Sequence, residues 1–233
     1  MTLWPAFFIT LLLSILWLRL IDFFAIKGII SQKLSRKIIH IGTGPIFVVC
    51  WLFFPEDHIS RYFAAFIPFL ISIQFFLIGL GVINDQASVE AMSRTGNPRE
   101  ILKGPFFYGI VFVLLTIIFW RESPIGIIAL MILCGGDGFA DVIGRRIPSN
   151  ALKWSPGKSM AGSTAMFFGG FIFSVVLFYI FVESGFLKLT LTDYLIKILF
   201  LSFIATIVES LPIKDWDNIT VPLSVVIVGL IIF

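Results

Sequence analysis

Two aspartates within an otherwise apolar stretch are the residues most suited to chemistry. Asp137 and Asp141 belong to the segment Cys134-Gly-Gly-Asp-Gly-Phe-Ala-Asp-Val-Ile-Gly-Arg-Arg146. Their spacing places both carboxylates on one face of a helix. Neighbouring carboxylates suit Mg²⁺, which proteins bind through one or two carboxylates together with the phosphates of a substrate. A solvated helix end is the simpler interpretation, but the two arginines that follow favour a metal site that handles phosphate.

A second segment combines basic residues with small ones. It reads Lys153-Trp-Ser-Pro-Gly-Lys-Ser-Met-Ala-Gly-Ser163, and we expect a helix to begin between Ser159 and Ser163. Small residues let backbone amides approach an anion, and the N-terminus of a helix favours phosphate. An ordinary basic loop is the alternative interpretation. We predict that phosphate or nucleotide is bound by Arg145, Arg146, Lys153, Lys158, Ser159 and Gly162.

The tripeptide Gly157-Lys158-Ser159 also resembles the end of a P-loop. That motif requires another glycine five residues before Gly157, and Leu152 occupies this position. A Walker-type ATPase is therefore excluded.

Polar residues beside other apolar stretches form a further group of candidates. Glu209 ends an apolar segment, where an acid is a functional candidate by default. Asp217 and Asn218 follow it closely and offer oxygen ligands or a partner for metal-bound water. His40 is explained equally well as a structural histidine or as a contact to substrate or phosphate. We predict metal binding by Asp137, Asp141, Glu209 and Asp217, and a substrate or accessory role for His40, Arg36, Arg94, Lys103 and Asn218.

The elements that must hold these residues are membrane helices. Of the 233 residues, 58% are hydrophobic and 13% are charged, and the mean hydropathy is +1.03. A soluble domain is about half apolar and about a quarter charged, so this chain lacks the polar residues to cover a surface in water. Its composition excludes a soluble enzyme, a disordered chain and a nucleic-acid-binding domain. We predict an all-α, polytopic integral membrane protein that forms a helical bundle.

Eight apolar runs approach the ~20 residues that a spanning helix needs. The last run is short, so we predict seven or eight transmembrane helices. The connections are short and no internal repeat is visible, which favours a single domain over residues 1–233, with its most specific motifs at 135–163 and 209–222. The runs cover residues 6–24, 38–54, 62–83, 105–120, 124–143, 163–182, 194–211 and 219–233.

The distribution of basic residues predicts the orientation in the membrane. Most of the 17 lysines and arginines lie in the connections that follow the odd-numbered runs. Cytoplasmic loops carry such an excess of basic residues, so the candidate site residues are expected at the cytoplasmic face. The other face holds only Arg61, Arg121, Lys188 and Lys197.

The motifs occur together in a characteristic order. The most specific are Gly136-Asp-Gly-Phe-Ala-Asp-Val-Ile-Gly-Arg-Arg146 and Gly157-Lys-Ser-Met-Ala-Gly-Ser163. They are accompanied by Arg36-Lys-Ile-Ile-His-Ile-Gly42, Ser93-Arg94 with Leu102-Lys-Gly-Pro105, Glu209-Ser-Leu-Pro212 and Asp217-Asn-Ile-Thr-Val-Pro222. This set resembles the polyprenol kinase family, most closely its phytol kinases, with dolichol kinases as more distant relatives. The short N-terminal region indicates a bacterial, cyanobacterial member rather than a plastid-targeted one.

The resemblance implies a reaction that composition does not show. The γ-phosphoryl group of a nucleoside triphosphate, typically CTP with Mg²⁺ or another divalent cation, would pass to the terminal hydroxyl of a prenyl alcohol. Phytol would become phytyl phosphate, which feeds tocopherol synthesis by salvage. Asp137, Asp141 and Lys158 would be catalytic. The prenyl chain would lie among membrane lipids and phenylalanine-rich helices, in a cell or thylakoid membrane, while the oligomeric state stays open.

Two other functions stay open as well. The family is similar to the cytidylyltransferases that make CDP-diacylglycerol, so a CTP:phosphatidate cytidylyltransferase is the first alternative. The Gly-Lys-Ser-Met-Ala-Gly-Ser and Asp-Asn-Ile-Thr-Val-Pro segments favour the kinase over it. A membrane transporter is the second, because acids within membrane segments also mark ion paths. A transporter would hold Asp137 and Asp141 near the bilayer centre, whereas an enzyme would open them to the cytoplasm.

Overall fold

The computed structural model describes residues 1–93, 95–213 and 216–233, which form helices and one small hairpin. Arg94, a predicted accessory residue, lies outside the described residues. Within the described residues, seven helices are long and apolar enough to cross a membrane, which confirms the all-helical, multi-pass prediction. These seven cover Leu3–Ile26, Gln32–Phe53, Ser60–Gly79, Pro98–Phe119, Pro124–Arg146, Met160–Glu183 and Leu191–Glu209.

The last helix, α10 (Asp217–Ile232), is apolar but has only 16 residues. At 1.5 Å per residue it extends ~24 Å, which is less than the ~30 Å of a bilayer's hydrocarbon core. The short final run is therefore confirmed as a helix, and a complete crossing by it stays a prediction.

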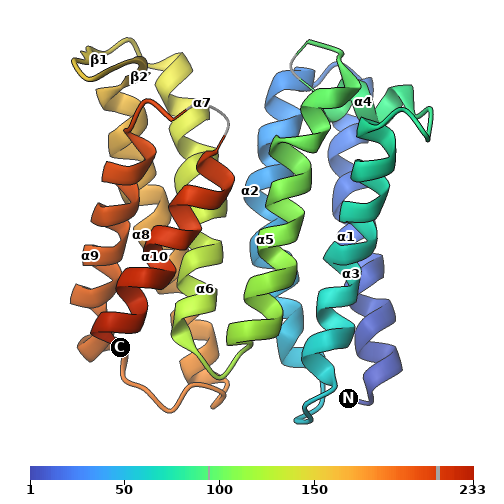
Figure 1. The fold of residues 1–233 in the computed structure, drawn as a ribbon. Helices are drawn as coiled ribbons and strands as arrows, with labels where there is room; N and C mark the ends of the chain where they lie inside the picture. The colour runs from blue at the N-terminus through green and yellow to red at the C-terminus, as the bar shows by residue number, and fades with distance from the viewer. Residues whose placement is uncertain (94, 214–215) are drawn as a thin grey trace. The chain divides into compact units, whose positions relative to one another are not determined.

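Contacts between residues group the chain into two compact units, Met1–Ile117 and Ile118–Phe233, which we call unit 1 and unit 2. Each is described by itself, and the organisation as one functional domain stays a prediction. Unit 1 contains the long helices α1 (Leu3–Ile26), α2 (Gln32–Cys50), α3 (Ser60–Gly79) and most of α5 (Gly104–Phe119) (Figure 1). A 3₁₀ turn, η1 (Trp51–Phe53), extends α2.

The connection between α3 and α5 in unit 1 is folded rather than open. It forms α4 (Gln86–Met92) and the 3₁₀ turn η2 (Pro98–Leu102) over a small buried cluster of Ile78, Val89 and Ile101. Asp85 caps α4, because its Oδ1 accepts a hydrogen bond from the Ser88 amide at 3.0 Å. Hydrogen bonds from Ser88 lower the pKa of Asp85. The Asp85 carboxylate therefore has a structural role as the cap of α4.

Unit 2 is organised around one buried helix. This helix runs through α6 (Pro124–Met131), the π-helical turn η3 (Ile132–Asp137) and α7 (Gly138–Arg146). Every residue from Ile125 to Gly136 is buried, and 78% of the most apolar 18-residue stretch of this helix lies inside the protein. The helices α8 (Met160–Glu183), α9 (Leu191–Glu209) and α10 pack around it (Figure 1). The turn η3 contacts all three of these helices, so residues of this turn lie among them.

Glycines allow α8 to approach the buried helix closely. A Cβ atom on Gly135 would lie 2.8 Å from the Gly169 carbonyl oxygen, and one on Gly136 would lie 3.0 Å from the Met166 carbonyl oxygen. Small residues bring helix backbones together in this way in membrane proteins. The π-helical turn that contains both glycines ends at Asp137, and such turns are frequent at functional sites. The contact therefore determines where Asp137 lies.

Replacing Gly135 with alanine should destabilise the protein by about 1–3 kcal/mol, because the added methyl group meets backbone that cannot move away easily. The measurement is the thermal midpoint of the purified protein in detergent. Gly157→Ala is the matched control, since none of the described atoms lies within 4 Å of a Cβ at Gly157. Equal midpoints for the two variants would contradict this account of the helix contact.

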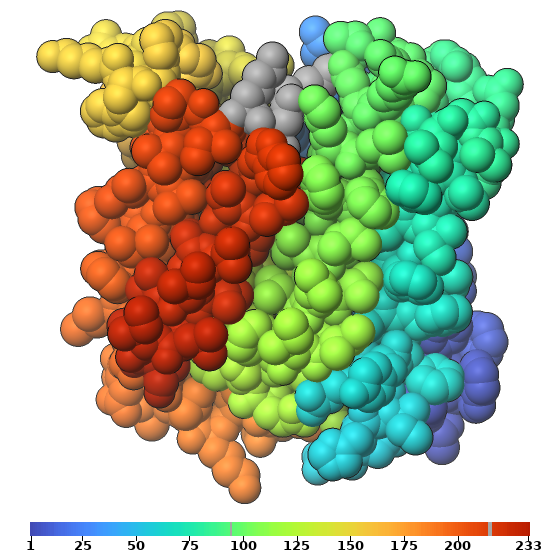
Figure 2. Space-filling view, viewed as in Figure 1, coloured from blue at the N-terminus to red at the C-terminus, as the bar shows by residue number. Residues whose placement is uncertain are grey.

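A two-stranded antiparallel hairpin connects α7 to α8. Strand β1 (Ala151–Leu152) pairs with β2 (Ser155–Ser159), with Ala151 opposite Ser159 and Leu152 opposite Ser155. In the space-filling view the hairpin, in yellow, forms one end of unit 2 (Figure 2). The sequence indicated a loop in this connection, but Pro156 lies in strand β2. Proline is tolerated since each strand of a two-stranded sheet has one free edge.

Candidate active site

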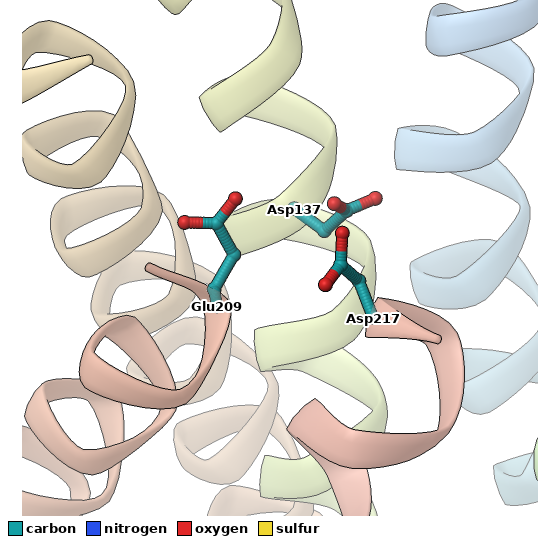
Figure 3. Close-up of side chains that lie close together, drawn as sticks. All are labelled: Asp137, Glu209 and Asp217. Atoms are coloured by element: carbon teal, nitrogen blue, oxygen red, sulfur yellow. The ribbon is translucent and has the colours of Figure 1, made fainter. Parts of the chain in front are cut away.

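Three carboxylates from distant parts of the chain converge in unit 2. Asp137 is the last residue of η3, Glu209 is the last residue of α9, and Asp217 is the first residue of α10. One oxygen of each lies within 4.8 Å of the others (Figure 3). We call these three residues the carboxylate cluster. Carboxylate oxygens are the ligands that Mg²⁺ and Ca²⁺ prefer, so the cluster fits a hard divalent cation.

Lys158, on strand β2, provides a positive charge to the cluster. Its ammonium donates a hydrogen bond to Glu209 Oε1 and another, at 3.1 Å, to Asp217 Oδ2. The side chains are 25% exposed for Lys158, 5% for Glu209 and 24% for Asp217. Burial acts to lower the pKa of Lys158, but the charges and hydrogen bonds of the two carboxylates outweigh it and raise the pKa above its usual value. The lysine is therefore charged at neutral pH.

The hairpin is held against the helix ends that carry the cluster. The Trp154 indole Nε1 donates to Ser210 Oγ at 3.3 Å, directly after Glu209. The Met160 amide donates to the Asn150 carbonyl oxygen at 3.0 Å and closes the base of the hairpin. These contacts direct Lys158 to the cluster. Trp154 and Ser210 were not among the residues predicted for the site, although both lie in or beside the motifs that predicted it.

Ser159 and Gly162 have structural contacts at the start of α8. The Gly162 amide donates to Ser159 Oγ at 3.2 Å, so Ser159 caps the helix and confirms the predicted start. A Cβ on Gly162 would lie 3.2 Å from the Ala140 carbonyl oxygen and 3.5 Å from Gly144 Cα, so this glycine also allows α7 and α8 to meet. Phosphate binding by Ser159 and Gly162 stays a prediction.

The structure separates the two aspartates that the helical spacing paired. Asp137 joins the carboxylate cluster, whereas Asp141 Oδ1 accepts a hydrogen bond from Arg145 Nε at 2.7 Å, one turn along the same helix. Arg146 and Lys153 are exposed near this end of unit 2. Metal binding by Asp141 and phosphate binding by the three basic residues stay predictions.

The remaining predicted residues have other surroundings. In unit 1, the Tyr108 hydroxyl donates to the His40 carbonyl oxygen at 3.0 Å, and the two rings lie 4.4 Å apart between centroids. Arg36 Nη1 donates to the Ser93 carbonyl oxygen at 3.1 Å. Lys103 follows η2, and in unit 2 Asn218 follows Asp217 at the start of α10. Contact between these residues and a substrate stays a prediction.

Fold and site together define a class of protein. The chain is a multi-pass helical membrane protein in which Glu209 and Asp217 lie at helix ends and the charged Lys158 lies on the hairpin, while Asp137 lies within the long helix Pro124–Arg146. Such a site suits an enzyme that handles a phosphorylated, cation-bound substrate at a membrane surface.

Comparison with known proteins identifies the family. The chain is 40% identical over 217 residues to the probable phytol kinase 1, chloroplastic, of Glycine max, covering 92% of this chain and 72% of the relative. It is 40% identical over 209 residues to the phytol kinase 1, chloroplastic, of Arabidopsis thaliana, covering 89% and 69%. It is 38% identical over 209 residues to the Arabidopsis thaliana farnesol kinase, chloroplastic, covering 89% and 68%. The chain belongs to the phytol and farnesol kinase family, as its motifs had indicated. No family model and no solved structure matches it.

Proposed function

We propose that this protein phosphorylates phytol. The γ-phosphoryl group of a nucleoside triphosphate passes to the terminal hydroxyl of the alcohol, giving phytyl phosphate and the nucleoside diphosphate. Two relatives that are 40% identical carry the name phytol kinase, and one that is 38% identical carries the name farnesol kinase. Both names refer to prenyl alcohols, so the proposed substrate class is a long apolar chain with one terminal hydroxyl. We further propose CTP as the donor and salvage of phytol for tocopherol synthesis as the setting.

The observation that carries the proposal is the convergence of Lys158 with the carboxylate cluster. Phosphoryl transfer depends on positioning and on neutralising charge on the phosphates. Asp137, Glu209 and Asp217 would hold Mg²⁺, which neutralises triphosphate charge when bound. Lys158 supplies a charge that stabilises the transferring phosphoryl group. Arg145, Arg146 and Lys153 are exposed at the same end of unit 2 and offer further charge to the phosphates.

The alcohol approaches from the membrane in this proposal. Its chain stays in the apolar region, and its hydroxyl reaches the interface where α9 ends and α10 begins. One carboxylate accepts the proton of the hydroxyl. We assign this role to Asp141, because it lies one turn beyond Asp137 and outside the carboxylate cluster. We also propose that this face lies in the cytoplasm, at a cell or thylakoid membrane, because its connections are rich in basic residues.

The direct test is a product assay with membranes that contain the protein. Radiolabelled CTP, ATP or UTP is supplied together with phytol, farnesol, geranylgeraniol, dolichol or phosphatidate. Labelled phytyl phosphate supports the proposal, and the most efficient nucleotide identifies the donor. CDP-diacylglycerol would instead support a cytidylyltransferase, and the absence of both products would favour a membrane transporter.

Lys158→Ala should raise the apparent KM for the nucleotide by about tenfold or more, since a charged hydrogen bond to phosphate contributes about 1.5–3 kcal/mol. The measurement is the rate as a function of nucleotide concentration at saturating phytol. Lys188→Ala is the matched control, because Lys188 is exposed in the connection between α8 and α9, at the other end of α8 from Lys158. An unchanged KM in Lys158→Ala would remove this lysine from the phosphate site.

A further inference from the structure

The Lys158 ammonium lies beside the carboxylates that would hold a cation. Its ammonium contacts oxygens of both Glu209 and Asp217, which are two of the three candidate ligands. Mg²⁺ binds oxygen at about 2.0–2.1 Å. An ion that uses the same two oxygens would therefore lie next to the ammonium. Two like charges at such a distance repel strongly where water is limited, and the Glu209 side chain is only 5% exposed.

When no ion is bound, the Lys158 ammonium stabilises the buried Glu209 carboxylate. Glu209 is buried at the C-terminal end of α9, where the helix dipole disfavours a negative charge. A buried carboxylate that loses its counter-charge strongly destabilises a fold. Lys158 supplies that counter-charge from an element outside the helices.

We propose that Lys158 is a built-in counter-ion of the carboxylate cluster, which a divalent cation displaces when it binds. The displaced ammonium then becomes available to the phosphates of the nucleotide. Binding of the cation thus prepares the lysine for its second partner, and the two charges do not contact the same two carboxylates at once. This inference rests on the proposed function for the identity of the second partner only.

The hairpin gives Lys158 the freedom that displacement requires. The side chain is 25% exposed, so the ammonium has a path to water. Lysine carries its charge on a flexible four-carbon stem, and rotation of this stem moves the ammonium without moving the backbone. The contacts of Trp154 and Met160 hold the hairpin itself in place.

The first test is a titration of the full-length protein with MnCl₂ in detergent, without nucleotide. Cation binding is followed by the thermal midpoint and by the electron paramagnetic resonance signal of free Mn²⁺. In Lys158→Met, which keeps the length of the side chain but removes its charge, the cation should bind about tenfold more tightly, the effect of losing ~1.4 kcal/mol of competition. Lys153→Met, on the same hairpin, should bind Mn²⁺ as the wild type does. Equal affinity in Lys158→Met and the wild type would overturn the proposal.

A second test uses the wild-type protein and does not depend on how a variant folds. Lysines are acetylated briefly with an N-hydroxysuccinimide ester in EDTA or in MnCl₂, and modification is measured by mass spectrometry. Mn²⁺ should increase modification of Lys158 several-fold relative to Lys153. An unchanged ratio would show that the ammonium keeps its place when the cation is present, and would also overturn the proposal.

These tests separate the inference from the proposed function. If the wild type phosphorylates phytol but Mn²⁺ affects Lys158 in neither test, only the displacement is wrong. If Mn²⁺ displaces Lys158 but no prenyl alcohol is phosphorylated, the displacement stands and the proposed function is wrong.

Discussion

Asp137→Asn is expected to lower the rate of phytol phosphorylation by about 10²–10³-fold, a loss typical of removing one group that stabilises transition-state charge. The substitution keeps the size of the side chain and removes one of the three charges of the carboxylate cluster. Asp137 ends the π-helical turn of the buried helix, so the packing of that helix fixes its position. The rate is measured with labelled nucleotide at saturating concentrations of both substrates.

Two further substitutions make this result specific. Asp193→Asn is the matched control, because Asp193 is exposed in the first turn of α9, at the opposite end of that helix from Glu209. It should leave the rate unchanged. Asp141→Asn should also lose activity, and its cation binding distinguishes the two predicted roles: binding is kept if Asp141 only accepts the proton of the alcohol and weakened if Asp141 is also a metal ligand. If Asp137→Asn retains the wild-type rate, the role of the cluster in binding a cation is wrong.

Glu209→Gln is expected to abolish stabilisation by divalent cations as well as most of the activity. A ligand that binds only the folded state stabilises it by about 2.7 kcal/mol at ~100 times its Kd. This increase should be present in the wild type with MgCl₂ and absent in Glu209→Gln, because a neutral amide is a poor ligand for a hard cation and Glu209 is one of the three members of the carboxylate cluster. The measurement is the thermal midpoint in EDTA and in MgCl₂.

The chain provides a close control for this variant. Glu183 is the last residue of α8, as Glu209 is the last residue of α9, but Glu183 is exposed. Glu183→Gln should keep both the cation response and the activity. A cation response that survives in Glu209→Gln would place the ion elsewhere and separate Glu209 from metal binding.

Most of the helices could be predicted because the signal for them is local. A chain in a bilayer must satisfy its backbone hydrogen bonds within each segment, so an apolar run of sufficient length becomes a helix wherever it occurs. Seven of the eight predicted runs correspond to helices long enough to cross, and the eighth is a shorter helix. The hairpin was missed because its strands are short, and one of them contains Pro156 and Gly157.

For the candidate site, the sequence predicted the residues but not which of them lie together. Asp137, Lys158, Glu209 and Asp217 were all selected from the sequence, because charged residues beside apolar runs are costly and therefore conspicuous. Sequence spacing alone did not predict which of these residues contact one another. Helical spacing pairs Asp137 with Asp141, but Asp141 contacts Arg145 and Asp137 lies with two acids from other helices.

By itself, the sequence determined that the protein is a helical membrane protein of the phytol and farnesol kinase family, and which charged residues are candidates for chemistry. Only the tertiary structure decided which of them meet. Lys158 lies 51 residues before Glu209 and 59 before Asp217, so no local pattern relates them. They meet because glycines let α8 approach the buried helix, a π-helical turn ends at Asp137, and the hairpin folds against the end of α9. Packing between segments depends on the shapes of all the surfaces involved, which no single stretch of sequence contains.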